Sequence, residues 1–270
     1  MTDGVKIDNR GNVLFVTLDR PRTLNALTLD DIADLRAAID DLDPGVRAIV
    51  FTSSGRTFCS GMNVDTFLGF DAAGARAFIG DLRDLLRKVR TLPVVTMCAV
   101  DGHCLGAAFE LAMACDLRIA TDRAVFGLPE IKVGIPSVVD AALLQQHVGL
   151  STAKEMILLG DGYPVGRLAG LCNAVVAPEA LAAAVGVFLG KVTPHSRTAV
   201  AAQKRLFEVW QNSSLTEGAD ISVDEFGSVF AAPETAERLA QYRAALGGEK
   251  NGATFVVDGQ QDLDNDRRRG

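Results

Sequence analysis

The stretch of sequence that decides the fold is Val100-Asp-Gly-His-Cys-Leu-Gly-Ala-Ala-Phe-Glu110. A predicted buried strand, 94–100, ends where this stretch begins, a glycine-containing loop follows, and a helix begins near Gly106. The first turn of a helix presents backbone N–H groups and the positive end of the helix dipole, which suits a developing oxyanion. The alternative interpretation is close packing of small residues between a helix and a sheet.

Glu110 is the unusual residue of this helix, because the residues around it from Ala107 to Ala114 are apolar on every face. A helix that is apolar all round is buried, and an ionised carboxylate is costly to bury unless it is compensated. We therefore expect a raised pKa for Glu110, as in many catalytic acids and bases. A structural pair with an arginine or with the helix start is the alternative.

Strands and helices alternate on both sides of this stretch. The predicted strands are 13–18, 48–52, 94–100, 117–120 and 124–127. The predicted helices are 29–42, which begins with a Thr28/Asp31 capping box, one with its apolar stripe between Phe78 and Val89 that ends before Pro93, and one around 106–115. Such alternation predicts an α/β fold with mostly parallel strands and buried crossover helices.

The last third of the chain has helical periodicity. Helices are predicted at 151–159, 178–191, 195–211, 216–230 and 233–245. We divide the chain into an α/β core (1–195), a helical oligomerisation region (196–247) and a polar tail (248–270) that we expect to be disordered.

Composition excludes several classes of protein. The chain has 270 residues with 27 basic and 34 acidic side chains, and this net charge of -7 does not favour binding to nucleic acid. Its longest charge-free run, 141–153, is too short to cross a bilayer, and the first residues lack the apolar stretch of a signal peptide, so we expect a cytoplasmic protein without a membrane span. The five cysteines form no CxxC pair and are interpreted as mostly buried thiols, and no residues have metal-ligand spacing.

Further candidates lie in two loops that follow predicted strands. The first loop is Phe58-Cys-Ser-Gly-Met-Asn63, and the second contains Glu130, for which a solvated turn is the alternative. Three aspartates, Asp101, Asp116 and Asp140, are interpreted as helix caps or surface acids.

These residues resemble the crotonase superfamily, also called the enoyl-CoA hydratase/isomerase family. Four motifs carry the resemblance, which covers about residues 5 to 245: Arg20-Pro-Arg-Thr-Leu-Asn-Ala26, Phe58-Cys-Ser-Gly-Met62, the segment Gly102 to Arg118, and Phe126-Gly-Leu-Pro-Glu-Ile131. The resemblance implies a spiral core of repeated ββα units, a C-terminal helical region that builds trimers or hexamers, and a site for coenzyme A thioesters. No cofactor is implied beyond the coenzyme A of the substrate itself.

The resemblance also assigns roles to residues. The backbone N–H groups of Met62 and Ala107 would form the oxyanion hole for the thioester oxygen, and Glu110 and Glu130 would be the catalytic carboxylates. The residues expected to contact the substrate are Leu24, Ala26, Ser60, Gly61, Asn63, Gly106, Leu128, Pro129 and Ser137.

The implied reaction is reversible addition of water to a 2-enoyl-CoA in acyl-CoA or fatty acid metabolism. Polarising the thioester carbonyl makes C3 electrophilic, so Glu110 would activate water for attack at C3 and Glu130 would deliver a proton to C2. Isomerisation with the Pro-Glu carboxylate alone, hydrolysis or decarboxylation of a thioester, and binding of acyl-CoA without turnover remain alternatives.

Three segments depart from the family pattern. Ala107 and Ala108 replace a glycine-rich position, Leu128 replaces a glutamine, and Ser137-Val-Val-Asp140 replaces a glycine-rich segment, so we expect a reshaped acyl pocket.

Overall fold

The structure, a computed structural model, describes residues 4–245 of the chain. The chain divides into two compact units, residues 1–219 and 220–270. Both sheets and helices α1–α7 belong to the first unit, which also carries the candidate site. The proposed boundary at residue 195 and the role of residues 196–247 in assembly stay predictions, and the predicted tail, 248–270, lies outside the described residues.

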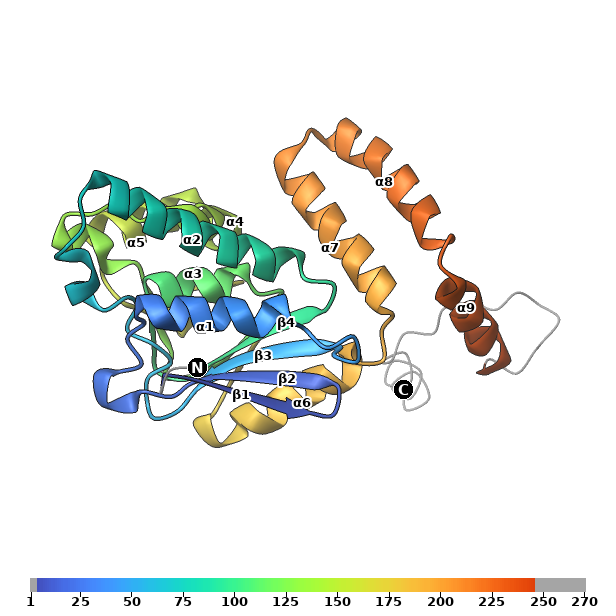
Figure 1. Ribbon diagram of the computed structural model, residues 1–270, viewed down its shortest axis with the longest axis horizontal. Coiled ribbons are helices and arrows are strands. Elements are labelled where there is room, and N and C mark those ends of the chain that lie inside the picture. The colour runs from blue at the N-terminus through green and yellow to red at the C-terminus, as the bar shows by residue number, and fades with distance from the viewer. Residues whose placement is uncertain (1–3, 246–270) are drawn as a thin grey trace, which may run out of the picture. The chain divides into compact units, whose positions relative to one another are not determined.

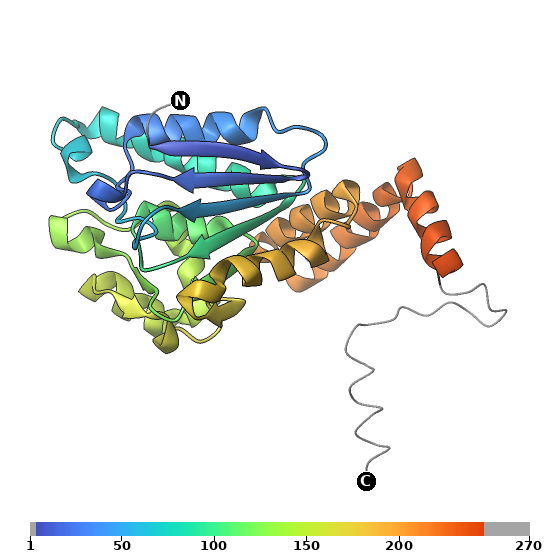
Figure 2. The ribbon, with the colours of Figure 1, turned by 90° about the horizontal axis from the view of Figure 1, so that it is seen from below.

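A six-stranded sheet forms the framework of the first unit. The strands of the described chain are β1 (Val5–Arg10), β2 (Val13–Leu18), β3 (Ala48–Ser53), β4 (Val95–Val100), β5 (His103–Leu105), β6 (Leu117–Thr121), β7 (Val125–Gly127), β8 (Tyr163–Pro164) and β9 (Ala174–Val176). The large sheet has the order β1-β2-β3-β4-β6-β9, in which only the β1–β2 pair is antiparallel (Figure 2). A smaller sheet has the order β5-β7-β8.

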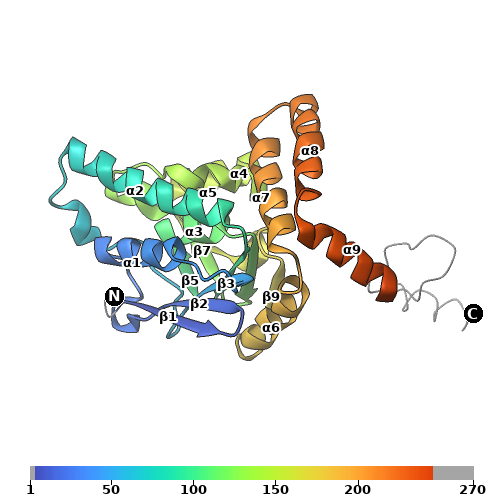
Figure 3. The same ribbon diagram turned by 45° about the vertical axis from the view of Figure 1, so that its right-hand side comes forward.

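The helices cover both faces of the large sheet. The helices of the described chain are α1 (Leu29–Asp40), α2 (Ala72–Thr91), α3 (Ala107–Ala114), α4 (Leu144–Val148), α5 (Leu150–Leu159), α6 (Leu181–Val192), α7 (Arg197–Asn212), α8 (Leu215–Val229) and α9 (Pro233–Ala245). Helices α1, α2 and α3 lie over one face and α6 lies under the other (Figures 1 and 3). The predicted strands and helices are all present, and the Thr28/Asp31 capping box begins α1.

Alternation along the strands explains this layering. In β3, Ile49 and Phe51 point into the core between the sheet and α1–α3. Ala48 and Val50 point into the core between the sheet and α6. Because successive side chains of a strand point to opposite faces, a continuous apolar run requires burial on both faces. The short run at 48–52 was therefore a sufficient signal for a central strand.

The small sheet places the loops of the site beside one another. Strand β5 leaves the end of β4 and leads directly into α3, so β4, β5 and α3 form one ββα unit. Cys59 forms a parallel bridge with Cys104 of β5, through the hydrogen bonds Cys59 N to His103 O at 2.9 Å and Leu105 N to Cys59 O at 3.0 Å. The 59–62 loop therefore runs alongside the start of α3.

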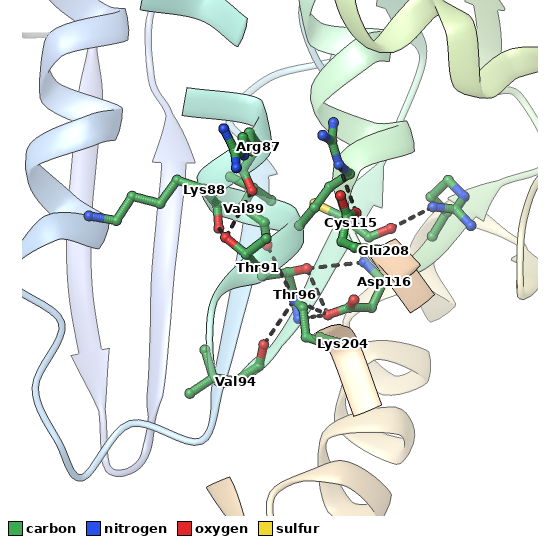
Figure 4. Close-up of polar contacts among 12 residues, drawn as sticks. Arg87, Lys88, Val89, Thr91, Val94, Thr96, Cys115, Asp116, Lys204 and Glu208 are labelled. Carbon is green, nitrogen blue, oxygen red and sulfur yellow. Dashed lines mark hydrogen bonds and ion pairs between the residues drawn. The ribbon is translucent and has the colours of Figure 1, made fainter. Parts of the chain in front are cut away.

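A buried ion pair anchors α7 to the core, as Figure 4 shows. Lys204 is 4% exposed. Its ammonium group donates to Asp116 Oδ2 at 2.7 Å and to the backbone carbonyls of Val89 and Val94. Asp116 also accepts from the backbone and hydroxyl of Thr96, at 2.7 and 2.9 Å. Asp116 is thus an anchor between elements, and its interpretation as a helix cap or surface acid was wrong.

The other two aspartates are also paired. Asp101 binds the Arg123 guanidinium, with Nε to Oδ1 at 2.6 Å, and Asp140 is buried against Arg90.

The interpretation of the cysteines as mostly buried thiols is confirmed, since four are buried and Cys172 is half-buried. Within residues 4–245, no helix is long and apolar enough to cross a membrane.

Candidate active site

A cavity of about 220 Å³ lies where the 60–62 loop, the start of α3 and the 3-10 helix Pro129–Val133 meet. Eight residues predicted from the sequence line it: Ser60, Gly61, Met62, Gly106, Ala107, Glu110, Pro129 and Glu130. Apolar side chains from α2 and from the segment after Glu130 complete the wall, including Phe78, Leu82 and Ile135. The cavity therefore combines an apolar lining with two carboxyl groups.

The other five predicted residues lie outside the lining of this cavity. Leu24 is exposed, Leu128 is fully buried in the core, and Asn63 accepts from the backbone of Asp65 at the start of a short 3-10 helix. Ala26 lies in the turn beside the 60–63 loop, and Ser137 reaches the site through Glu130.

Two residues of the cavity lining, Met62 and Ala107, have backbone N–H groups without a hydrogen-bond acceptor among the described residues. Gly61 and Gly106 precede them with φ angles of 93° and 55°, which side chains rarely adopt. A Cβ added to Gly106 would lie 3.6 Å from the Gly61 Cα and 2.8 Å from Glu130 Oε1, so a side chain there would displace the Glu130 carboxyl group. Ala107 is the first residue of α3, where the helix leaves N–H groups without internal partners.

Asn25 binds the segment 54–58, which leads into the 58–62 loop, and was not among the residues predicted for the site. Its side chain is 2% exposed and its Nδ2 donates to the carbonyls of Ser54, Thr57 and Phe58 at 2.9, 2.8 and 3.2 Å. Its Oδ1 accepts from Arg20 N–H at 2.7 Å.

Asn25 also has unusual backbone geometry. Leu24 and Asn25 both have positive φ, at 56° and 54°, so two successive residues adopt the left-handed conformation. Asparagine tolerates this conformation better than most residues. The Leu-Asn pair in a loop was therefore a usable signal for a special turn.

Glu110 is buried in the middle of α3, as predicted. It is 3% exposed, and its Oε2 accepts from the Asp140 backbone N–H at 3.2 Å. Burial, followed by the charges of Glu130 and Asp140, raises the pKa of Glu110 to about 9, although the Asp140 N–H acts in the opposite direction. Glu110 therefore carries a proton at neutral pH in the free protein.

Glu130 lies on the opposite wall. The Ser137 hydroxyl donates to Glu130 Oε2 at 2.7 Å, and its other oxygen lies beneath Gly106. The arrangement thus presents one protonated and one hydrogen-bonded carboxyl group to a cavity with two N–H donors. No cluster of three or more metal-ligating side chains occurs among the described residues.

Comparison with known proteins places the chain in a family. Residues 8–246 match the enoyl-CoA hydratase/isomerase family, and the chain belongs to it. The crotonyl-CoA hydratase of Syntrophomonas wolfei is 29% identical over 261 residues, which cover 94% of this chain and 98% of that protein.

Solved structures agree with this assignment. An enoyl-CoA hydratase of Mycobacterium smegmatis has a TM-score of 0.83 and 27% identity, covering 90% of this chain and 96% of that chain. A Thermobifida fusca protein solved in complex with CoA has a TM-score of 0.78 and 28% identity, covering 87% of this chain and 95% of that chain. The family and the crotonase-like α/β fold expected from the sequence are therefore confirmed, whereas the roles of individual residues stay predictions.

Proposed function

We propose that this protein is an enoyl-CoA hydratase, a lyase that reversibly adds water to a 2-enoyl-CoA thioester. The observation that carries the proposal is the joint presence of Glu110, Glu130 and the N–H groups of Met62 and Ala107 on one cavity. The enoyl-CoA hydratase names of similar proteins and the CoA bound to the Thermobifida fusca neighbour support it. Coenzyme A enters as part of the substrate, with no separate cofactor.

The N–H groups of Met62 and Ala107 would bind the thioester oxygen. As the water oxygen bonds to C3, the C2–C3 π electrons move toward the carbonyl and form an enolate, whose negative oxygen these two donors stabilise. Gly61 and Gly106 permit the positive φ angles with which the backbone carries these two donors to the cavity. Such preorganised donors typically contribute the largest single part of the rate enhancement in reactions of this kind.

The carboxyl groups would divide the proton transfers. From the sequence we expected Glu110 to activate water and Glu130 to deliver the proton, but burial raises the pKa of Glu110 to about 9 and so favours its protonated form. We therefore assign the reverse order: Glu130 takes a proton from the attacking water, and Glu110 gives its proton to C2. One proton enters the pair and one leaves it, so the number of protons on the pair is the same before and after each turnover. The two carboxyls titrate as a coupled unit.

The test uses purified protein and 2-enoyl-CoA substrates of graded chain length, followed by loss of the conjugated enoyl absorbance. Glu110→Gln and Glu130→Gln should each lower turnover by roughly 100-fold or more, and the double variant should be hardly worse than the poorer single one. Glu155→Gln is the matched control, since Glu155 binds Tyr163 and Arg167 away from the cavity.

The outcomes separate the alternatives. If Glu110→Gln keeps most turnover on isomerisation substrates while Glu130→Gln abolishes it, the protein is an isomerase. Wild-type rates in both variants would remove both carboxyls from the reaction and favour a binding protein, a hydrolase or a decarboxylase. Hydratase activity that rises, rather than falls, as pH passes about 9 would restore Glu110 as the base.

We also propose that the protein assembles as a trimer or hexamer and acts on acyl-CoA in the cytoplasm. Large apolar side chains of α7 and α8 are exposed in the single chain: Phe207, Trp210 and Phe226 are 47%, 47% and 68% exposed. Exposed apolar surface of this kind commonly marks a protein interface.

A further inference from the structure

A strained turn delivers a hydrogen bond to Glu110 from outside the cavity. Val139 has a φ of 51°, although its β-branched side chain disfavours this conformation. Such strain costs on the order of 1–3 kcal/mol and persists only where the surroundings enforce it. The next residue, Asp140, directs its N–H onto Glu110 Oε2 at 3.2 Å. The turn therefore maintains contact with a carboxyl group of the candidate site.

Arg90 enforces this turn from α2. Its guanidinium contacts Asp140 Oδ1 directly, and its Nε donates to Glu208 of α7 at 3.0 Å. Asp140 is 5% exposed, and its other oxygen, Oδ2, is buried without a hydrogen-bond partner among the described residues. A buried acceptor left in this way is costly. The Glu110 carboxyl group already contacts the backbone of Asp140. When Glu110 is protonated, it also has an O–H donor close to the Asp140 side chain.

We propose that Asp140, held by Arg90, is a positioning residue that orients the Glu110 carboxyl group for proton transfer. Asp140 does not line the cavity, so it acts through Glu110 and not on the substrate. Its part in the reaction rests on the proposed function, in which Glu110 is the proton donor. Its contact with Glu110 is independent of that function.

The charges around Glu110 give the direction of the effect. Glu130 faces Glu110 from the Pro129–Val133 helix and Asp140 from the 3-10 helix Val139–Leu143, while Arg90 and Glu208 act on Asp140. The negative charge of Asp140 favours the protonated form of Glu110, and its N–H favours the ionised form. Asp140→Asn removes the charge and keeps the N–H. The Glu110 pKa should therefore fall.

The experiment is a ¹³C titration of the Glu110 carboxyl in the full-length protein. Glu110 is assigned by the signal missing from Glu110→Gln. In Asp140→Asn the Glu110 pKa should fall by about one unit, the lower end of what a nearby like charge produces. The pH at which hydratase activity declines should fall by the same amount. Asp101→Asn is the control, because it also breaks a pair with an arginine but should leave the Glu110 titration unchanged.

A Glu110 titration that does not move in folded Asp140→Asn would overturn the inference, whatever the activity. A shift in the titration of a protein that hydrates no enoyl-CoA would keep the Asp140–Glu110 coupling and refute the proposed function instead. If Asp140→Asn does not fold, Arg90→Lys is the second test. It keeps a positive charge but loses the guanidinium fork, and should lower kcat by roughly tenfold with KM unchanged. An unchanged kcat in this variant would also overturn the inference.

Discussion

Asn25→Ala should be among the most damaging single substitutions in the protein, although Asn25 does not line the cavity. Asn25 joins the turn at 20–26 to the segment 54–58 through three hydrogen bonds, and it accepts a fourth from Arg20 N–H within the turn. Alanine removes both the amide donors and the acceptor. The carbonyls of Thr57 and Phe58 and the N–H of Arg20 would then lose a buried partner.

The size of the effect follows from these contacts. Each lost hydrogen bond contributes about 1 kcal/mol net, and a buried group without a partner costs about 1–3 kcal/mol. Alanine is also less suited than asparagine to the φ of 54° found here, which adds about 1 kcal/mol. Water entering the space recovers part of the loss. We expect the free energy of unfolding to fall by about 3–5 kcal/mol, a large part of the total stability of an ordinary domain.

Urea unfolding followed by circular dichroism measures this change, at one fixed protein concentration because assembly would add to apparent stability. Asn63→Ala is the matched control. It removes one cap hydrogen bond at 3.1 Å, near the surface, and should cost about 1 kcal/mol or less. If the two variants differ from wild type by equal amounts, the reasoning about Asn25 is wrong.

The remaining predictions concern the site and assembly. Ala107→Pro should keep the fold, since proline is accepted at the first position of a helix, yet lower turnover by roughly 100-fold or more by deleting one N–H donor; a folded variant at full activity would remove Ala107 from the oxyanion hole. Light scattering should give a trimer or hexamer, and a monomer of 28.6 kDa at micromolar concentration would exclude both.

Because the pKa of Glu110 is raised in the folded state, its contribution to stability is present below pH 4.5 and lost as pH rises through about 9. Glu110→Gln should therefore resist urea better than wild type at pH 9, by more than about 1 kcal/mol, and lose this advantage near pH 4.5. An equal difference at both pH values would contradict the shift.

The elements of the core could be predicted because their signals are local. The apolar run 48–52 and the stripe of α2 are each visible within one segment, and both elements are present. Strand β1 was missed, since it lies at the edge of the sheet with most of its residues exposed and so carries charges where a central strand is apolar. The short strands β8 and β9, of two and three residues, are too brief to carry a pattern.

The partners of buried charges could not be predicted in the same way. The burial of Glu110 followed from its apolar neighbours, but Asp140 was interpreted as a cap or surface acid because its own segment gives no sign of Arg90, fifty positions away. Ion pairs between distant segments depend on how helices pack, which one sequence does not encode locally. The same reason explains why Lys204 and Asp116 were not recognised as a pair.

The division of the site between a helix and a loop has a chemical consequence. Ala107 and Glu110 lie within one turn of α3, so a single helix sets the distance between the Ala107 N–H and the Glu110 carboxyl group. Arg118 secures the other end of that helix by donating to the carbonyls of Ala112 and Cys115 at 3.1 and 2.7 Å.

Glu130, in contrast, belongs to the loop that follows β7, and it depends on Ser137 for its orientation. The departures from the family pattern at Leu128 and at 137–140 fall in or beside this loop. Under the proposed function, substitutions there would change the acyl group accepted or the fate of the enolate, while the N–H of Ala107 and the carboxyl group of Glu110 would stay in place on α3. Differences in specificity between this protein and its relatives should therefore follow the loop at 128–140 more closely than α3.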